Sequence, residues 1–426
     1  MNLPFAGKPP GAGQPSPNAA DGGRALAGGR LGSTGGGTAE ATFLHPASRA
    51  VVSLDAITAN TRRLKELAGQ AQVMAVVKAN GYGHGMVASA RAAMAGGAGY
   101  LGVAQLAEAL ELHRALAWPR PPILSWIYPA GAIDLLGQGL ASQIELGVSL
   151  PEQLDGIGQA VKQTGQVARL HLKLDTGLGR AGGPAASWEA LVRAALAAQA
   201  EGLVELAAMW THFAYADSPN HPTVLAQEAA FAEGMALAQR LGARFELAHV
   251  ANSAALLTGR PCRYDMVRPG LAMYGLSPIP DQASSGELGL VPAMTLESEF
   301  TLVKRLPQGH GVSYGHMYHT PGDTVVGLVP MGYAEGVFRH ASNRAEVWVA
   351  GRRVPVAGRI CMDQFVVDLG PGAGEAAGER VVLFGPGHNG EPTAQEWAEV
   401  AGTISYEIVT RIPQHVPRVY VGGGAG

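Results

Sequence analysis

The feature that most constrains the fold is a regular alternation of short apolar segments and helical segments between residues 49 and 275. Two of the helical segments, residues 187–202 and 223–242, carry Ala and Leu at helical spacing. The apolar segments are nine in number: RAVVSL, VMAVVKA, YLGVA, PILSWIY, QIELGV, ARLHLKLD, VELAAMWTHF, FELAHVANS and DMVRPGLAMYG. A repeated strand-then-helix order is typical of parallel strands joined by crossover helices, so this region predicts a parallel α/β sheet.

The number and character of these strands favour a closed barrel. The strands are apolar on both faces, as a sheet covered on both sides requires. Nine candidates exceed by one the strands of a (β/α)8 TIM-type barrel, and we expect the first, residues 49–54, to pair elsewhere. An open doubly wound sheet is the alternative, but no G-x-G-x-x-G motif follows an early strand.

Beyond about Pro292 the pattern changes to short alternating strands separated by Gly, Pro and Asp. Such segments occupy residues 301–306, 324–330, 345–358, 364–370 and 379–385, and one helical segment begins at a capping Thr393. The sequence therefore predicts a C-terminal β-strand domain. We expect the barrel to span residues 48–286 and the β-domain to span residues 287–421.

The first 47 residues are rich in Gly and Pro and poor in large apolar side chains. Such a segment buries too little surface to offset its ordering entropy, which predicts a disordered tail. It also lacks the continuous apolar core of a secretory signal peptide. The GGGAG end, residues 422–426, predicts a second, shorter tail.

Composition excludes several classes of function. The net charge is -3 and no basic cluster with interleaved aromatics occurs, so we expect no nucleic-acid partner. No run of about 18 apolar residues exists, so no membrane-spanning helix is expected. Two cysteines, Cys262 and Cys361, form neither a disulfide framework nor a metal-ligand spacing, which favours the reducing cytoplasm.

Polar side chains gather where the predicted barrel strands end. These residues are Lys78, Tyr82, Lys173, Asp175, Arg180, His212, Asn252, Ser253, Arg268 and Gly270. The C-terminal ends of barrel strands meet at one rim, where functional groups lie. The set holds no cluster of Cys, His and Glu, so no metal is expected, and there is no G-x-S-x-G motif. A lysine amine, arginines and a Ser/Gly set able to hold a phosphate suit pyridoxal 5'-phosphate.

Ten motifs then carry a specific resemblance to a known family. They are VVKANGYGHG, LKLDTGLGR, WTHFAYAD, ANSAAL, DMVRPGLAMYGL, VSYG, GYAEG, GRICMDQ, SYEI and VPRVY. In order and spacing, from about Arg49 to Tyr420, the chain resembles the bacterial alanine racemases. The resemblance implies a (β/α)8 barrel followed by a β-domain and a cytoplasmic homodimer. It also implies an isomerase that uses pyridoxal phosphate to interconvert L- and D-alanine, supplying D-alanine for cell-wall peptidoglycan.

The resemblance also implies roles for the cofactor-binding residues. Lys78 would form the Schiff base with the cofactor, which explains a lysine at the end of a buried strand. Arg268 would face the pyridine nitrogen, with His212 supporting it from behind. The phosphate and the rest of the cofactor would be held by Tyr82, Asn252, Ser253, Tyr406 and the backbone amides of Gly270 and Leu271.

For the substrate, the resemblance implies two acid-base groups on opposite faces of the cofactor. Lys78 would serve one face and Tyr314, from the other subunit, the second. Arg180 and the backbone of Met362 would receive the substrate carboxylate, and Tyr333 would line the entrance. Lys173 matches a position that is often carbamylated in relatives, and an ordinary ion pair of Lys173 with Asp175 is the alternative.

Two residues depart from the family's pattern, and three other functions stay open. Glu335 stands where aspartate is usual, and His415 stands where arginine is usual.

One alternative function is a racemase with broader preference or a preference for serine or lysine. A non-catalytic barrel that binds pyridoxal phosphate and a decarboxylase on a related barrel are the others. The VSYG motif with Tyr314 disfavours both the non-catalytic barrel and the decarboxylase. The predicted β-domain also disfavours the non-catalytic barrel.

Overall fold

The computed structural model describes residues 47–260 and 264–423 of the chain. The expected N-terminal tail lies outside the described residues except for Ala47, and so do Cys262 and the last three residues of the expected C-terminal tail. Gly423, in that second segment, donates its backbone N–H to the Asp55 carboxylate at 2.9 Å. The C-terminal segment is therefore tied to the fold at least as far as this residue.

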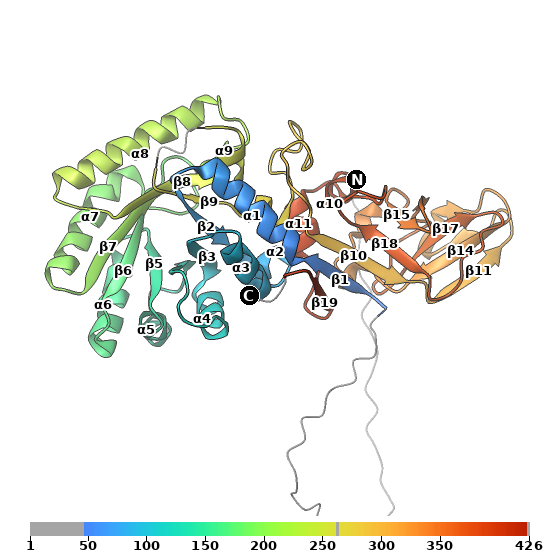
Figure 1. The fold of residues 1–426 in the computed structure, drawn as a ribbon, viewed down its shortest axis with the longest axis horizontal. Helices are drawn as coiled ribbons and strands as arrows, with labels where there is room; N and C mark the ends of the chain where they lie inside the picture. The colour runs from blue at the N-terminus through green and yellow to red at the C-terminus, as the bar shows by residue number, and fades with distance from the viewer. Residues whose placement is uncertain (1–46, 261–263, 424–426) are drawn as a thin grey trace, which may run out of the picture. The chain divides into compact units, whose positions relative to one another are not determined.

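A closed barrel of eight parallel strands forms the N-terminal half (Figure 1). Its strands are β2 (Gln72–Val76), β3 (Tyr100–Gln105), β4 (Ile123–Ile127), β5 (Ile144–Val148), β6 (Ala168–Lys173), β7 (Val204–Trp210), β8 (Leu247–Asn252) and β9 (Met266–Arg268). The parallel pairing of β2 with β9 closes the ring, with Val73 opposite Val267. The predicted barrel is confirmed, and the open-sheet alternative is wrong.

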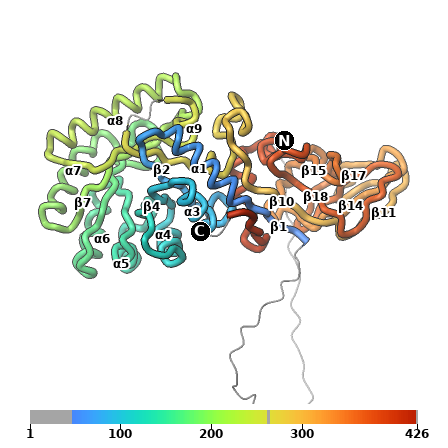
Figure 2. The backbone as a smooth tube through the Cα atoms, viewed as in Figure 1, coloured from blue at the N-terminus to red at the C-terminus, as the bar shows by residue number. Residues whose placement is uncertain are grey.

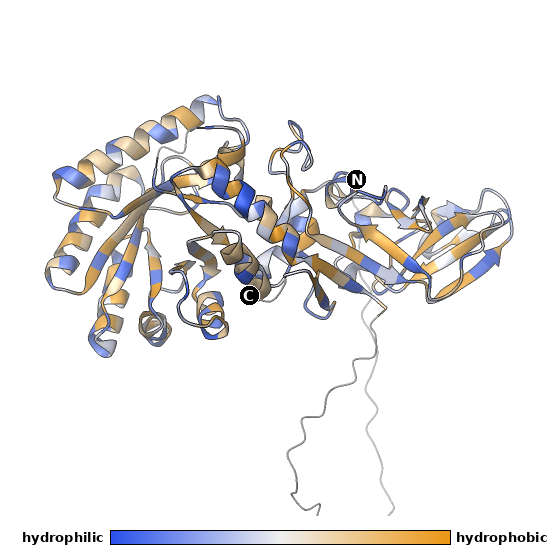
Figure 3. Ribbon diagram, viewed as in Figure 1, coloured by the Kyte–Doolittle hydropathy of each residue, from blue (hydrophilic) through white to orange (hydrophobic). Residues whose placement is uncertain are grey.

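Helices follow the strands and cover the outside of the barrel. They are α1 (Leu54–Ala68), α2 (Lys78–Tyr82), α3 (Met86–Ala95), α4 (Leu106–Ala115), α5 (Ile133–Ala141), α6 (Glu152–Thr164), α7 (Ala185–Ala200), α8 (Pro222–Arg240) and α9 (Ser253–Leu257). Figure 3 shows hydrophobic colour along the barrel strands and a mixture of both colours on the helices. The neighbouring residues Val73 and Met74 of β2, which point to opposite faces of the sheet, are both fully buried, as a sheet covered on both faces requires.

The first strand, β1 (Arg49–Ser53), lies outside the barrel, as expected from the sequence. It pairs antiparallel with β10 (Met294–Glu299) and parallel with β19 (Arg418–Val421). Figure 2 shows this N-terminal segment beside the tube of β10, although more than two hundred residues separate them in the chain. The C-terminal sheet thus contains a strand from the segment that the sequence assigned to the barrel.

The C-terminal half is built mainly of strands. Besides β10 and β19 these are β11 (Leu302–Leu306), β12 (Gly311–Val312), β13 (Tyr318–His319), β14 (Thr324–Val329), β15 (Glu346–Val349), β16 (Arg352–Pro355), β17 (Phe365–Gly370) and β18 (Arg380–Phe384). Two helices, α10 (Ala394–Ala401) and α11 (Ser405–Thr410), complete it, and Thr393 caps α10 as expected. The strands form a six-stranded sheet in the order β16-β15-β18-β10-β1-β19, a three-stranded sheet and a two-stranded ribbon.

Five elements of this half were not expected from the sequence: β10, the two-residue strands β12 and β13, β19 and α11. The strand β10 carries a buried carboxylate, Glu297, which breaks its apolar pattern. Glu297 accepts from Nε of Arg49 on β1 and from Nε of Arg380 on β18, both at 2.7 Å. One carboxylate therefore joins three neighbouring strands of the sheet.

We expect Glu297→Gln to lower the free energy of unfolding by about 2 kcal/mol, because an amide cannot accept two charged hydrogen bonds as a carboxylate does. Urea denaturation measures the change. Glu299→Gln, two residues further along β10, is the matched control and should stay within about 0.5 kcal/mol of wild type. Equal losses in both variants would show that the bridge to Arg49 and Arg380 contributes nothing.

Candidate active site

The chain turns sharply where β2 ends, and this turn presents Lys78. Ala79, Asn80 and Tyr82 all have positive φ, at 51°, 53° and 52°, with Gly81 between them at 61°. Left-handed backbone costs a non-glycine residue roughly 1–2 kcal/mol, so the surroundings must hold this turn. The carboxylate of Glu108 accepts from the Ala79 N–H at 2.7 Å, and further contacts hold the other end.

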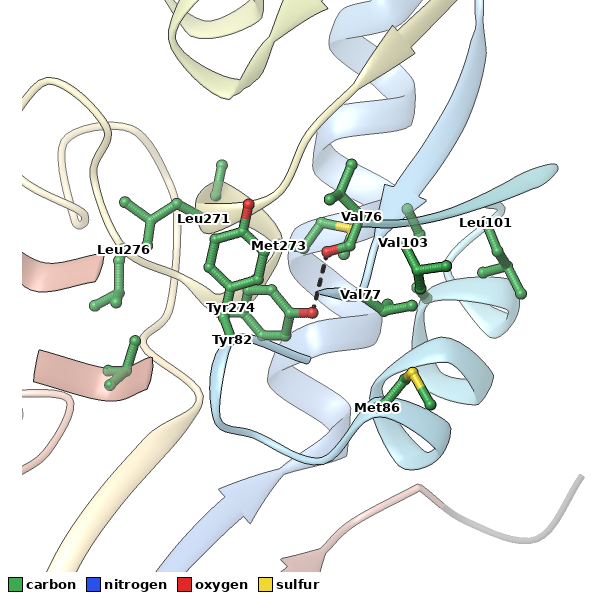
Figure 4. Packing of buried hydrophobic residues seen from close by; sticks show 14 of the residues in the cluster. Val76, Val77, Tyr82, Met86, Leu101, Val103, Leu271, Met273, Tyr274 and Leu276 are labelled. Carbon is green, nitrogen blue, oxygen red and sulfur yellow. Dashed lines mark hydrogen bonds between the residues drawn. The ribbon is translucent and has the colours of Figure 1, made fainter. Parts of the chain in front are cut away.

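Two buried rings hold the far end of this turn. Tyr82 stacks on Tyr274 with ring centroids 5.0 Å apart, and the Tyr274 hydroxyl donates to the Val76 carbonyl at 3.2 Å (Figure 4). His84 stacks on the same Tyr274 ring, and its Nδ1 lies 2.9 Å from the Tyr82 carbonyl. The turn that carries Lys78 and Tyr82 is therefore fixed by the strand it follows and by the segment after β9.

A pocket at this rim gathers side chains from many strand ends. Its lining consists of Val76, Lys78, Ala79, Tyr82, Trp126, Lys173, Arg180, Trp210, His212, Asn252, Ser253, Arg268, Gly270, Leu271, Tyr406 and Thr410. All nine residues predicted to bind the cofactor are among them, and so is Arg180. The structure thus brings together residues that lie more than three hundred positions apart in the chain.

The two tryptophans of this pocket were missed from the sequence: Trp126 is the penultimate residue of β4, and Trp210 is the last residue of β7. The Lys78 amine lies 6.0 Å from the Trp126 ring centroid. The Lys173 amine and the Arg268 guanidinium lie 4.3 and 5.0 Å from the centroid of Trp210. Cations placed over aromatic faces are stabilised by the ring quadrupole. A tryptophan at the end of a barrel strand was the signal that could have found them.

The charge of the pocket is unbalanced. Four cationic side chains line it (Lys78, Lys173, Arg180 and Arg268), and no carboxylate is among the described lining residues. Burial, and then Arg180, lower the pKa of Lys78 below its usual value. Burial and the neighbouring Arg268 and Arg180 lower the pKa of Lys173 to about 8. Such a site favours an anionic ligand and makes its lysines more nucleophilic than a surface lysine.

Backbone groups at the ends of β8 and β9 form a close-fitting wall of this pocket. The Ser253 hydroxyl accepts from the N–H groups of Gly270 and Ala272 at 2.9 and 3.3 Å. A Cβ at Gly270 would lie 2.3 Å from the Tyr82 hydroxyl oxygen, so only glycine allows that approach. Tyr406 lies near the same wall, its ring centroid 6.2 Å from that of Tyr82. Small residues, hydroxyls and excess positive charge fit a phosphate ester.

Arg268 is almost fully buried and its guanidinium is held on several sides. It donates to the carbonyls of Thr211 and Val250 at 2.7 and 3.1 Å. Its distance to Nδ1 of His212, the supporting residue expected from the sequence, is 3.3 Å. Nδ1 of His249, which sequence reasoning did not single out, lies closer, at 2.9 Å.

Arg180 lies at the exposed rim on a loop that Asp175 organises. The Asp175 carboxylate accepts from the backbone N–H groups of Gly177, Leu178 and Gly179 at 3.0 to 3.2 Å. The expected alternative, an ion pair of Asp175 with Lys173, is not among the ion pairs of the described residues. Asp175 thus shapes the loop that carries the Arg180 guanidinium to the pocket.

Three predicted site residues lie elsewhere. Tyr314, Tyr333 and Met362 are not among the described residues that line the pocket, and they are 72, 40 and 53% exposed. They lie close to one another on the C-terminal half: the N–H of Tyr333 donates to the Cys361 carbonyl, and Ser313 contacts the Cys361 sulfur. We call Tyr314, Tyr333 and Met362 the exposed triad.

The two departures from the family pattern meet each other beside this triad. Glu335 accepts from the Gly332 N–H at 2.7 Å, which closes the short turn that carries Tyr333. Its other oxygen lies 3.4 Å from Nε2 of His415. The longer carboxylic side chain thus reaches the ring of His415, and neither residue is among the described residues that line the pocket.

Two kinds of feature are absent from the described ranges, 47–260 and 264–423. None of their helices is long and apolar enough to cross a bilayer. No group of three or more His, Cys, Asp or Glu side chains in them is arranged to hold a metal ion.

Comparison with known proteins defines the class. The profile of the alanine racemase N-terminal domain matches residues 52–278, and that of the alanine racemase C-terminal domain matches residues 293–420. The chain belongs to the alanine racemase family.

Two relatives and one solved structure show how far the likeness extends. The alanine racemase of Streptomyces coelicolor is 50% identical over 379 residues, which cover 88% of this chain and 96% of that protein. The alanine racemase of Beutenbergia cavernae is 50% identical over 376 residues, 88% of this chain and 98% of that protein. The crystal structure of alanine racemase from Streptomyces lavendulae superposes with a TM-score of 0.86 at 48% identity, covering 89% of this chain and 98% of that one.

The close approach at Gly270 can be tested directly. We expect Gly270→Ala to lower the free energy of unfolding by about 1–3 kcal/mol, because its methyl group overlaps the Tyr82 hydroxyl. In a Tyr82→Phe background the same substitution should cost less, by about 1 kcal/mol, because the overlapping oxygen is gone. Urea denaturation of the four proteins gives both values.

Gly286→Ala is the matched control, because nothing lies within 4 Å of a Cβ at that position. It should leave the unfolding free energy nearly unchanged. Equal costs of Gly270→Ala in the two backgrounds would contradict the contact with Tyr82.

Proposed function

We propose that this chain is an alanine racemase that interconverts L- and D-alanine with pyridoxal 5'-phosphate. The observation that carries the proposal is the half-buried Lys78 side chain in a pocket with four cations and no carboxylate among its described lining residues. Membership of the alanine racemase family supports the same reaction. A D-alanine-forming enzyme of this kind would act in the cytoplasm and supply cell-wall peptidoglycan.

The residues present fit the cofactor. Lys78 would hold it covalently, and Tyr82, Asn252, Ser253, Tyr406 and the N–H groups of Gly270 and Leu271 would surround its phosphate end. The Arg268 guanidinium, which can only donate hydrogen bonds, would face the pyridine nitrogen and keep it unprotonated. When bound, pyridoxal phosphate supplies an electron sink that acidifies the hydrogen on the substrate's α-carbon.

The chain's own residues would move the proton. Burial and Arg180 lower the pKa of Lys78, so its amine can accept a proton nearer neutral pH than a free lysine could. Tyr314 would deliver a proton to the opposite face. Arg180 and the backbone N–H of Met362 would hold the substrate carboxylate, and Tyr333 would line the entrance.

The exposed triad supports a two-fold homodimer. Tyr314, Tyr333 and Met362 are exposed on the single chain and lie outside the described wall of the Lys78 pocket. In a two-fold dimer each contact is repeated by symmetry, so one protomer's triad can complete its partner's pocket and be completed in turn. We infer that Tyr314 acts on the pocket of the other subunit.

Substrate preference tests the proposed function. Purified protein with added pyridoxal phosphate is incubated with L-alanine, L-serine and L-lysine, and each D-enantiomer is measured. D-alanine should form fastest. Formation of D-serine or D-lysine alone, or of all three D-amino acids at similar rates, would favour the alternative racemase with a different or a broader preference. Formation of no D-enantiomer would contradict both racemase functions.

The covalent role of Lys78 has its own test. Borohydride reduction followed by peptide mapping should place the cofactor on Lys78, the amine with the lowered pKa at the end of β2. Lys78→Arg keeps the charge but not the reactive amine, so it should lose the covalent link and nearly all activity. A label on Lys173 or Lys162 would refute the assignment.

Mixed dimers test the action of Tyr314 across subunits. Lys78→Ala and Tyr314→Phe homodimers should each be almost inactive. Refolding them together in equal amounts makes half of the dimers mixed, and each mixed dimer has one intact site, so activity should recover to roughly a quarter of wild type. No recovery, with mixed dimers shown by native mass spectrometry, would place both groups in one chain.

A further inference from the structure

A series of buried polar side chains runs through the barrel interior from the pocket. Nη1 of Arg268 lies 2.9 Å from Nδ1 of His249, and Nε2 of His249 lies 2.9 Å from Nδ1 of His171. Nε2 of His171 lies 2.6 Å from a carboxylate oxygen of Glu145. These residues belong to β9, β8, β6 and β5. Barrel interiors are usually filled by branched apolar side chains, so this polar series needs a reason.

The burial of the series makes it costly unless every group is satisfied. His171 and His249 have no exposed surface, and Glu145 and Arg268 are 4 and 5% exposed. Glu145 also accepts from the Tyr100 hydroxyl at 2.7 Å and from Nε of Arg169 at 2.9 Å. A fully satisfied buried network rigidifies its members, and a partly satisfied one destabilises the fold.

The geometry assigns every proton in the series. Arginine can only donate, so Nδ1 of His249 accepts and the proton of this ring is on Nε2. That proton is donated to Nδ1 of His171, so the proton of the second ring is also on Nε2, and it is donated to Glu145. A doubly protonated His171 would leave His249 with no proton at all, so both rings are neutral.

The pKa values of His249 and Glu145, the two groups beside His171, are shifted by burial and by their neighbours. Burial, together with Arg268, lowers the pKa of His249 well below its usual value. Burial would raise the pKa of Glu145, but the hydrogen bonds from His171, Arg169 and Tyr100 lower it to about 2. A carboxylate at one end and a guanidinium at the other therefore orient two neutral imidazoles between them.

The series also explains how a buried arginine is kept without a carboxylate at its side. The groups that accept from Arg268 are the carbonyls of Thr211 and Val250 and the rings of His212 and His249. Burial and the nearby Arg268 lower the pKa of His212 well below its usual value, so that ring is neutral too. The nearest anion that the network supplies is Glu145, two rings away.

We propose that Glu145 is a positioning residue: through His171 and His249 it holds the Arg268 guanidinium in one orientation at the pocket. The inference deepens the proposed racemase function and rests on it. A carboxylate directly beside Arg268 would neutralise the cation that faces the cofactor. The rings of His171 and His249 instead fix the direction of the Arg268 guanidinium, and its positive charge remains available to attract the ligand.

Glu145→Gln tests the series because an amide has nearly the same shape. If its NH2 faces His171, that ring must move its proton to Nδ1, and the reversal continues until His249 presents a donor to Arg268. If its oxygen faces His171, the NH2 faces the Nε donor of Arg169. The first arrangement frees Arg268. The second breaks the bond from Arg169 and gives His171 a neutral acceptor, which is weaker than a carboxylate, so both arrangements loosen Arg268.

We expect Glu145→Gln to lower kcat about 10- to 100-fold, with a smaller change in KM and a shifted absorption band of the bound cofactor. Tyr100→Phe is the matched control, because it removes a hydrogen bond to the same carboxylate oxygen but leaves the series intact. It should keep kcat within about twofold of wild type and lose a similar amount of thermal stability. A wild-type kcat and spectrum in Glu145→Gln, or an equal kcat loss in Tyr100→Phe, would overturn the proposal.

Neutron diffraction from wild-type crystals keeps the proposal testable even if Glu145→Gln does not fold. Deuterium should occupy Nε2 of both His171 and His249 and be absent from both Nδ1 atoms. Deuterium on Nδ1 of His249 would overturn the proposal. This measurement does not depend on the reaction. A wild-type protein without racemase activity would contradict the proposed function, whereas the neutron map alone would still test the proton positions in the series.

Discussion

The pairing of β2 with β9 is the contact on which the site depends. It closes the ring, and it places the end of the first barrel strand beside the end of the last. The Val76 N–H donates to the Pro269 carbonyl at 3.1 Å, so Lys78 follows one side of this seam and Gly270 the other. The Tyr274 hydroxyl bonds the Val76 carbonyl across the same seam. In an open sheet, β2 and β9 would lie at opposite edges or be separated by other strands, and the pocket would not form.

Positive charge concentrated at that seam has to be compensated. Lys78, Lys173, Arg180 and Arg268 share one pocket, and its described wall offers no carboxylate. Part of the compensation is internal, through tryptophan faces and the hydrogen-bond series that ends at Glu145. The remainder is left for a ligand. The positive charge of the pocket is only partly compensated by the chain itself, and an anionic ligand completes the compensation. The pocket therefore favours a phosphate ester and a carboxylate substrate over neutral molecules.

The strand β1 connects the two halves of the chain in a way that bears on the exposed triad. It enters the C-terminal sheet between β10 and β19 and then leads directly into α1 of the barrel half. The C-terminal half is thereby held by β1, and Glu297 fixes that strand through its hydrogen bond from Arg49. The two-fold dimer proposed above would need the surface around the exposed triad to keep its shape before the partner arrives, and these pairings would supply that rigidity.

Sequence alone determined the barrel, the extra first strand, the β-rich second half and the polar residues of the pocket, but not its two tryptophans. Periodicity shows the first three, because buried parallel strands and alternating strands have different patterns. The order of the ten family motifs along the chain indicated which polar residues line the pocket. Tertiary structure decided how Lys78 is presented: three non-glycine residues with positive φ follow it, and the contacts that hold them there include the rings of Tyr274 and His84 and the carboxylate of Glu108. It also decided that Glu145, His171 and His249 form one series, since residues far apart in the chain meet only when the barrel closes, and no local pattern records which side chains then face each other.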